Sequence, residues 1–289
     1  MGLWDGNLRN SPSDVAIDSI LLLAIAVLYI PQIARIISSQ STYGISPYFI
    51  LFNAIFSNIQ LANTLLLAAR AWPTDKSPVL ELIGNGQLRG SKAFGAVLGL
   101  IQVALQWAFS IILVMLYATY PASSAPSASS SITRTSIPIT AFIHAALFLL
   151  PAVVIALPKP LPPSINVDIF TGFSAIINTW VSLIFVTLQF YPQYLELRRQ
   201  AGDPGALSLL TLGMQAVVLI LIAVRWLQRL GAPTWGRQAV PASYWFQWGW
   251  LPFNYIVSGI GCTVLLGMYL RARRGGRVRI VGEETPLLI

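Results

Sequence analysis

Two stretches of the chain nearly repeat one another: "YIPQIARIISSQSTYGIS" at residues 29–46 and "FYPQYLELRRQAGDPGALS" at residues 190–208. Each places a Pro-Gln pair late in a long apolar run, and each reaches a glycine thirteen residues after its proline, Gly44 and Gly205. Proline lacks a backbone N–H and its ring collides with the carbonyl four residues earlier, so it is costly inside a helix. A chain that carries the same costly feature twice contains an internal repeat.

The composition indicates a polytopic membrane protein. Of the 289 residues, 55% are hydrophobic and only 10% are charged, whereas a soluble domain carries about 25% charged residues. A helix needs roughly 20 apolar residues to cross about 30 Å of hydrocarbon. We therefore expect an all-α fold with seven membrane spans, at residues 14–37, 45–70, 93–118, 137–157, 169–197, 205–229 and 242–270.

The scarce residue types exclude several kinds of site. The single cysteine, Cys262, and the single histidine, His144, are too few for a disulfide framework or a metal site built from these residues. The sequence contains no recognisable nucleophile–base pair of the kind that would indicate an enzyme. We expect no catalytic residue, no metal and no cofactor.

The net charge of +8 does not predict nucleic-acid binding. Five arginines gather at residues 271–279, directly after an apolar run, as in a juxtamembrane anchor on the cytoplasmic side. Residues 1–13 are short and polar and lack the features of a cleaved signal peptide. We therefore expect a lumenal or exterior N-terminus and a cytoplasmic tail at residues 271–289.

The two Pro-Gln pairs divide the spans into two units of three. Residues 14–118 and 169–270 are expected to form equivalent three-helix bundles that run in parallel sense, as in a parallel internal repeat. Residues 119–168 then supply a loop and a connector helix. The order of spans is three, one, three.

The Pro-Gln pairs also suggest a gate. Inside a bilayer, the carbonyl freed by a proline must find a partner or line a wet cavity. A glutamine side chain carries two donors and an acceptor, so it can satisfy backbone groups or bond across to the other three-helix unit. We predict that Pro31, Gln32, Pro192 and Gln193 form paired hinges at the cytoplasmic gate.

At these residues the chain resembles the PQ-loop repeat family, which includes cystinosin, the lysosomal cationic amino acid exporters and, more distantly, the SWEET sugar transporters. The resemblance extends over nearly the whole chain and includes "STYGISPYF" (41–49) and "GDPGALSLL" (202–210), which open the second and sixth spans. "STYGISPYF" is especially similar to fungal PQ-loop proteins without a settled substrate. The resemblance implies a transporter of small polar solutes that uses alternating access, often coupled to protons and often in the lysosome or vacuole membrane.

Polar side chains at helical spacing mark a candidate solute path. On apolar helices such side chains either line a pathway or bond neighbouring helices. We favour the pathway for the set, because the stripes occur on four spans of the repeated units, and repeat transporters bind substrate near the membrane midplane. The candidates are Asn53, Ser57, Gln60, Gln102, Gln106, Asn178, Ser182, Asn254 and Ser258.

Acidic residues are missing from the middle of every expected span, whereas the proton-coupled members of the family carry aspartates within their later helices. The candidate proton sites are Asp18, Asp168 and His144. The alternatives are an interfacial position for the two carboxylates and a packing role for the histidine. Arg225 is expected to snorkel to the interface. Facilitated diffusion without proton coupling is therefore the alternative to proton-coupled transport.

The last residues, "EETPLLI" (283–289), place Glu283 before Leu287 and Leu288. This spacing resembles an acidic dileucine signal, an address that a cytosolic sorting adaptor reads. It favours the vacuole or lysosome as the destination.

Three functions are compatible with the sequence. The leading one is a vacuolar or lysosomal transporter of amino acid-like solutes, whose partners are the bilayer, the solute, a sorting adaptor and, if transport is coupled, a proton. The second is an uncoupled sugar facilitator of the SWEET type. The third is a seven-helix receptor or cargo-recognition protein. The sequence does not indicate an oligomeric state.

Overall fold

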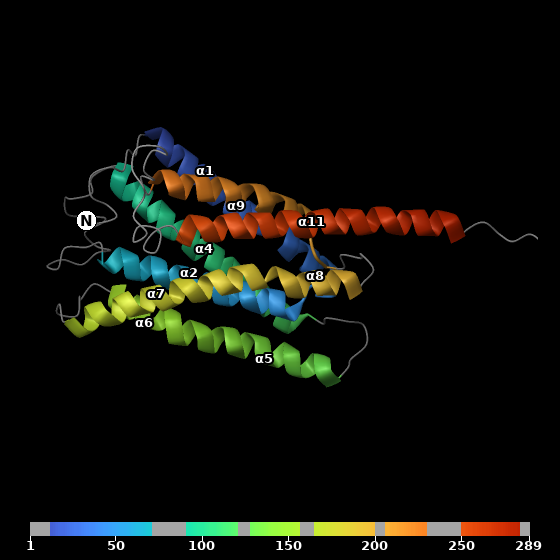
Figure 1. Cartoon of the computed structure of the whole chain (residues 1–289), viewed down its shortest axis with the longest axis horizontal. Helices are drawn as coiled ribbons and strands as arrows, with labels where there is room; N and C mark the ends of the chain where they lie inside the picture. Colours follow the sequence, from blue (N-terminus) through green and yellow to red (C-terminus); the bar gives the residue numbers. More distant parts are fainter. Residues whose placement is uncertain are drawn as a thin grey trace, which may run out of the picture.

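The chain forms a bundle of long helices that lie nearly side by side (Figure 1). The computed structural model describes residues 12–70, 91–120, 128–156, 165–199, 206–229 and 250–283. The first three spans are α1 (Pro12–Ser39), α2 (Pro47–Arg70) and α4 (Ser91–Thr119). The connector consists of α5 (Ala128–His144), the π-helical turn η1 (Ala145–Leu149) and α6 (Leu150–Ala156). The last three spans are α7 (Ile165–Leu188) with α8 (Phe190–Arg199), α9 (Leu209–Arg229) and α11 (Trp250–Glu283).

The predicted all-helical membrane fold is confirmed. Within the described residues, six helical stretches are long and apolar enough to cross a bilayer, and α7, which has 24 residues, occupies the place of the predicted fifth span. The order of helices along the chain agrees with the predicted three, one, three arrangement.

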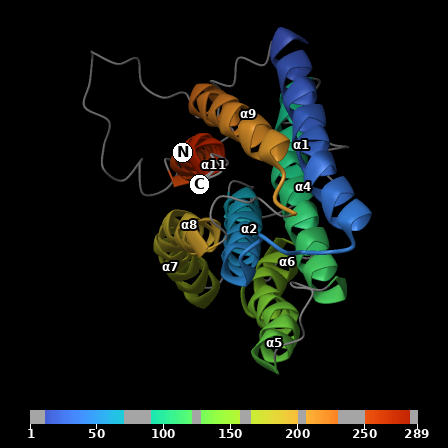
Figure 2. The same cartoon turned by 90° about the vertical axis from the view of Figure 1, so that its right-hand side faces the viewer.

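The third helix of each three-helix unit lies between the first and the second. α4 packs against both α1 and α2, and α11 packs against both α7 and α9. The two units meet along two seams, one between α1 and α9 and one between α2 and α7, as the view along the bundle shows (Figure 2). Exchanging α1 with α7 and α2 with α9 converts one seam into the other. The bundle therefore has the pseudo-twofold axis of a parallel repeat.

The connector packs on the first unit, against α2 and α4. It becomes helical at Ala128, and its membrane-spanning part, Thr135–Val153, agrees to within a few residues with the predicted span at 137–157. The π turn lies just before Pro151, where the Leu150 N–H bonds to the carbonyl of Ala145 five residues earlier. A wider turn accommodates a proline whose ring would collide with the carbonyl of Leu147 in a regular helix.

The two Pro-Gln prolines have different effects on their helices. α1 continues unbroken through Pro31. The predicted fifth span, in contrast, is two helices that meet at Gln189, three residues before Pro192. α7 ends at Leu188, whose carbonyl is the one that Pro192 cannot pair with. The second repeat therefore has a joint in its first span that the first repeat lacks.

The ends of the last two spans also differ from the prediction. α9 begins at Leu209 rather than at 205, and α11 continues past 270 to Glu283, where it extends beyond the other helices (Figure 1). The predicted start of the seventh span, at 242, lies outside the described residues. α1 begins at the end of the bundle opposite to the one from which α11 emerges, in agreement with an odd number of crossings.

A buried ion pair joins α1 to α9 near the start of α1. Arg225 donates from Nε to Asp18 Oδ1 at 2.6 Å and from Nη2 to Asp18 Oδ2 at 3.3 Å, and its Nη1 lies 2.9 Å from a carboxylate oxygen of Asp14. Asp18 is 0% exposed and Arg225 is 6% exposed. The expectation that Arg225 snorkels to the interface is wrong, because carboxylates on α1 hold its guanidinium inside the bundle.

Replacing Arg225 with methionine should destabilise the fold strongly. The Asp18 carboxylate would stay buried without its bidentate partner, and breaking a buried pair from one side costs about 3–5 kcal/mol. The double variant Asp18→Leu/Arg225→Met removes both charges and should recover most of the loss. Thermal unfolding of the purified protein in detergent measures both changes. A double variant as unstable as the single one would contradict this account.

Candidate functional site

Gln32, which follows the first proline, binds the loop that precedes the sixth span. Its side-chain Nε2 donates to the carbonyl of Ala206 at 2.9 Å, and its Oε1 accepts from the backbone N–H of Ser208 at 2.7 Å. Gln32 is buried. One amide side chain therefore satisfies a donor and an acceptor of a buried loop, which would otherwise lack partners inside a bilayer.

Gln193, which follows the second proline, makes the two equivalent bonds to the loop that precedes the second span. Its Nε2 donates to the carbonyl of Gly44 at 2.8 Å, and its Oε1 accepts from the N–H of Ser46 at 2.9 Å. We call these two sets of bonds the glutamine clamps. Each clamp joins a helix of one repeat to the loop of the other, so together they seal one end of the bundle across the pseudo-twofold axis.

The clamps fix how the two repeats correspond. The glutamines are 161 residues apart, but the atoms that they bind belong to pairs 162 residues apart, Gly44 with Ala206 and Ser46 with Ser208. The loop of the second repeat is thus longer by one residue. The sequence comparison equates Gly44 with Gly205, whereas the contacts equate it with Ala206. Positions in α1 and α7 therefore correspond with a shift of 161, and positions in α2 and α9 with a shift of 162.

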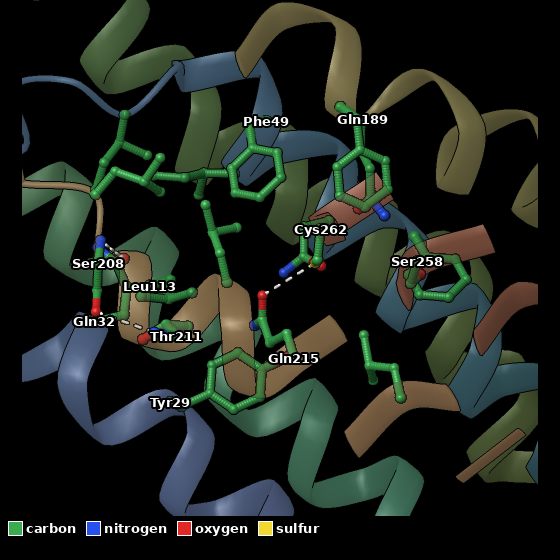
Figure 3. Close-up of a pocket in the computed structure, with 18 of the residues that line it drawn as sticks. Tyr29, Gln32, Phe49, Leu113, Gln189, Ser208, Thr211, Gln215, Ser258 and Cys262 are labelled. Carbon is green, nitrogen blue, oxygen red and sulfur yellow. Dashed lines mark hydrogen bonds between the residues drawn. The ribbon is translucent and has the colours of Figure 1, made fainter. Parts of the chain in front are cut away.

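A pocket lies between the repeats, next to the clamps (Figure 3). The cavity volume is about 50 Å³. Figure 3 shows Gln215 reaching across it toward Cys262, whose thiol donates to Gln215 Oε1 at 3.5 Å. The polar side chains that line it are all neutral: Tyr29, Gln32, Asn53, Gln106, Gln189, Ser208, Thr211, Gln215, Ser258 and Cys262.

The lining follows the pseudo-twofold axis. With the shifts given above, five residues of the first repeat that line the pocket have counterparts of the second repeat that also line it, whereas the counterparts of Gln32 and Phe56 do not. The pairs are Tyr29 with Phe190, Ile45 with Leu207, Phe49 with Thr211, Ile50 with Leu212 and Asn53 with Gln215. The pocket is therefore shared by both repeats, and any movement of one repeat against the other changes its shape.

Several polar atoms of the lining are available to a bound molecule. Oε1 of Gln106, Oε1 of Gln189 and the hydroxyl of Thr211 are buried and have no hydrogen-bond partner among the described residues. Buried polar atoms are normally paired with protein or water. Amide, hydroxyl and aromatic groups can hold a small polar solute by hydrogen bonds and ring contacts without any change of charge.

The predicted pathway residues divide into two groups. Asn53, Gln106 and Ser258 line the pocket. Gln60 and Asn178 are buried in α2 and α7 outside its lining.

The remaining four predicted pathway residues bond neighbouring elements. Asn254 Nδ2 donates to Ser182 Oγ at 3.1 Å, which joins α11 to α7. Gln102 Nε2 donates to the backbone carbonyl of Asp18 at 3.1 Å. The hydroxyl of Ser57 lies 2.5 Å from that of Ser110 on α4. Outside the pocket, these side chains hold helices together.

Of the candidate proton sites, Asp18 and His144 do not line the pocket. Asp18 is held by Arg225. His144 ends α5 in the connector and stacks on Phe148 with ring centroids 4.4 Å apart. Asp168 belongs to α7, but its side chain lies outside the described residues, as do the side chain of Glu283 and the whole of Leu287 and Leu288.

Six polar lining residues are absent from the predicted pathway: Tyr29, Gln189, Ser208, Thr211, Gln215 and Cys262. Ser208, Thr211 and Gln215 follow one another at offsets of three and four residues where the sixth span begins, and this short polar series was overlooked. The correspondence with Asn53 would have identified Gln215, but it requires the shift of 162 rather than the shift of 161 that the prolines suggest.

Residues 16–70 match the family model described as the PQ loop repeat. The first three-helix unit thus carries a PQ loop repeat. The match covers most of α1, the loop bound by Gln193 and the whole of α2. No curated protein and no solved structure matches the chain. The second repeat is recognised instead by its Pro-Gln pair, its helix packing and its reciprocal clamp.

Replacing one clamp glutamine should loosen only the loop that it binds. Gln32→Met keeps the length of the side chain but leaves the Ser208 N–H and the Ala206 carbonyl unpaired, at a cost of about 1–3 kcal/mol for each buried group. Hydrogen exchange should become faster in the segment that begins at Ala206 and change less in residues 43–46. Gln193→Met should give the reverse.

Gln189→Met is the matched control, because this glutamine lines the pocket without taking part in either clamp. The two clamp variants should differ from it and from each other. Equal exchange in both loops for all three variants would contradict the reciprocal assignment.

Proposed function

We propose that this protein, which carries a PQ loop repeat, transports small polar solutes across the membrane by alternating access. The observation that carries the proposal is the neutral polar pocket on the pseudo-twofold axis, closed at one end by two clamps that join the repeats. A solute site at the interface of two repeats can face one side or the other as the repeats rock. The family, whose members include solute transporters, supports the same function.

The clamped end is proposed as the cytoplasmic gate. Four hydrogen bonds close it, and the helices that carry the glutamines contain the prolines on which these ends would bend. α11 extends past this end of the bundle (Figure 1), with the arginine-rich residues 271–279 at its tip. Such a cluster favours the cytosol, and this supports a lumenal side for the start of α1.

The neutral lining favours solutes that need hydrogen bonds rather than ion pairs. Amino acid-like solutes are the proposed class. An uncoupled sugar facilitator is the second candidate, favoured by the uncharged side chains of the lining and by the engagement of Asp18 with Arg225. The dileucine-like end of the tail supports a vacuolar or lysosomal location and an adaptor as partner.

Reconstitution in vesicles tests the proposal directly. Uptake of radiolabelled amino acids and sugars is measured with and without a pH gradient. Saturable uptake of at least one solute is expected, and a rate that does not respond to the gradient would favour the facilitator. If no solute is taken up while a peptide ligand binds tightly, the protein is a receptor instead.

Substitutions in the pocket should lower uptake without unfolding the protein. Asn53→Leu and Gln215→Leu each remove a hydrogen-bonding amide from corresponding walls of the pocket. A lost bond of about 1.4 kcal/mol lowers the apparent affinity about tenfold. Thr211→Val is compared with Thr187→Val, because Thr187 is an exposed threonine outside the pocket. Uptake unchanged by Asn53→Leu, Gln215→Leu and Thr211→Val would place the solute elsewhere.

The hinge role is tested by Pro31→Ala and Pro192→Ala. Each substitution restores a backbone N–H and allows a regular helix, so transport should slow while thermal stability is kept or increased. Pro192→Ala should have the larger effect, because only the second repeat is broken at its proline. Uptake and melting temperature are measured on the same preparations. A parallel loss of both would mean that the prolines are purely structural.

A further inference from the structure

The two seams between the repeats correspond in position but differ in chemistry. The shifts of 161 and 162 residues pair positions of the α1–α9 seam with positions of the α2–α7 seam. Ile25 corresponds to the equally buried and apolar Val186. At five other positions the α2–α7 seam holds an amide or a hydroxyl: Asp18 and Thr179, Leu21 and Ser182, Leu28 and Gln189, Ile222 and Gln60, and Arg225 and Asn63.

A contact present in both seams supports this correspondence. Arg225 binds Asp18 across the α1–α9 seam. Their counterparts, Asn63 and Thr179, meet across the α2–α7 seam, where Asn63 Nδ2 lies 3.5 Å from Thr179 Oγ1. The same place in the two repeats thus carries a bidentate ion pair on one side and a neutral contact on the other.

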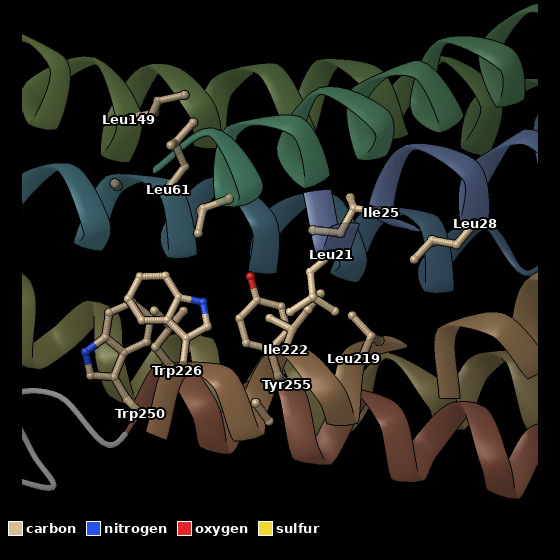
Figure 4. Close-up of a cluster of buried hydrophobic side chains, with 14 of the residues drawn as sticks. Leu21, Ile25, Leu28, Leu61, Leu149, Leu219, Ile222, Trp226, Trp250 and Tyr255 are labelled. Atoms are coloured by element: carbon tan, nitrogen blue, oxygen red, sulfur yellow. The ribbon is translucent and has the colours of Figure 1, made fainter. Parts of the chain in front are cut away.

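The α1–α9 seam consists of apolar side chains and one buried ion pair. Leu21 and Leu28 of α1 belong to one buried apolar cluster with Leu219 and Ile222 of α9, and Figure 4 shows Leu21 next to Ile222. The Asp18–Arg225 pair completes this seam at the end away from the clamps. Opening it would expose apolar surface and separate a buried ion pair.

The α2–α7 seam is apolar nearer the clamps, where the rings of Phe52 and Phe185 lie 5.2 Å apart. Toward the opposite end it is polar and incompletely paired. Asn63 Oδ1 and both amide atoms of Gln60 are buried without a hydrogen-bond partner among the described residues. The Asn63–Thr179 contact is at the upper limit of a hydrogen-bond distance. Buried polar groups without partners are costly, so water that enters this seam would satisfy groups that the closed state leaves unpaired.

The polar side of α2 connects the pocket to this seam. Asn53 lines the pocket, and Gln60 follows seven residues later, which is about two helical turns and therefore the same face. Asn63 lies nearly one turn further along. Because α2 begins next to the clamps at Pro47, this series leads away from them toward the opposite end of the bundle.

We propose that the pocket opens to the face opposite the glutamine clamps along the α2–α7 seam, with the α1–α9 seam as the closed pivot. This rests on the proposed transport function, because only a transporter needs both faces to open. The connector packs on α2 and α4, so it moves with the first repeat, and α7 separates from α2 when the seam opens.

Thiol labelling tests the opening without any knowledge of the solute. In a Cys262→Ala background, Gln60→Cys and Ile222→Cys place one thiol at corresponding depths of the two seams. A membrane-impermeant methanethiosulfonate reagent is added to the face opposite the clamps. Gln60→Cys should react at least about tenfold faster than Ile222→Cys, a difference in opening equilibrium of about 1.4 kcal/mol. Equal rates, or a faster reaction of Ile222→Cys, would overturn the proposal.

Cross-linking gives the second measurement in the same background. A disulfide between Asn63→Cys and Thr179→Cys should abolish uptake, and reductant should restore it. A bifunctional thiol cross-linker between Asp18→Cys and Arg225→Cys, long enough to fill the space of the removed arginine side chain, replaces the ion pair with a covalent link and should leave most of the uptake. Blockage by this cross-link would overturn the assignment of the pivot.

The two tests separate this inference from the proposed function. Asymmetric labelling in a protein that takes up no solute would support the opening and reject transport. Uptake together with equal labelling rates at the two positions would support transport and reject opening along the α2–α7 seam. The single-cysteine variants, treated in the same way, control for modification of individual positions.

Discussion

A buried loop in a bilayer must satisfy its backbone groups without water, and two glutamine side chains meet this constraint here. The side-chain amide of glutamine carries the same donor and acceptor as a peptide group, so each one completes a short stretch of the other repeat's backbone. An apolar side chain could fill the same space but would leave an N–H and a carbonyl unpaired. The pairing of the loops, and with it the position of α2 and α9, depends on these two residues.

The asymmetry between the repeats is as informative as their symmetry. Five pairs of corresponding positions hold leucine, isoleucine and an ion pair on one seam, and amides and hydroxyls on the other. In the arrangement of the backbone alone, the two seams occupy equivalent positions. Side-chain chemistry makes one of them resistant to water and the other receptive to it, and this difference assigns distinct mechanical roles to helices that have the same position in their repeats.

Much of the fold could be predicted from the sequence, because apolar length and the repeated Pro-Gln pair are strong one-dimensional signals. The number of spans, the parallel repeat and the possibility that the glutamines bond across it follow from them. The break at Gln189 could not, since it depends on local packing around the proline. Arg225 was misjudged because its partners, Asp14 and Asp18, are more than 200 residues away in the sequence. The correspondence of Gln215 with Asn53 was hidden by a loop that is one residue longer.

The direct contact between the two clamped loops adds a further consequence. The Ala206 N–H donates to the carbonyl of Tyr43 at 2.5 Å, so the loops bind one another as well as the glutamines. Neither loop can leave its place without disturbing the bonds of the other. The loss of one glutamine therefore loosens the loop that it binds while this backbone bond still ties that loop to the other. If this end is the proposed gate, it opens fully only when both clamps and the bond between the loops are released.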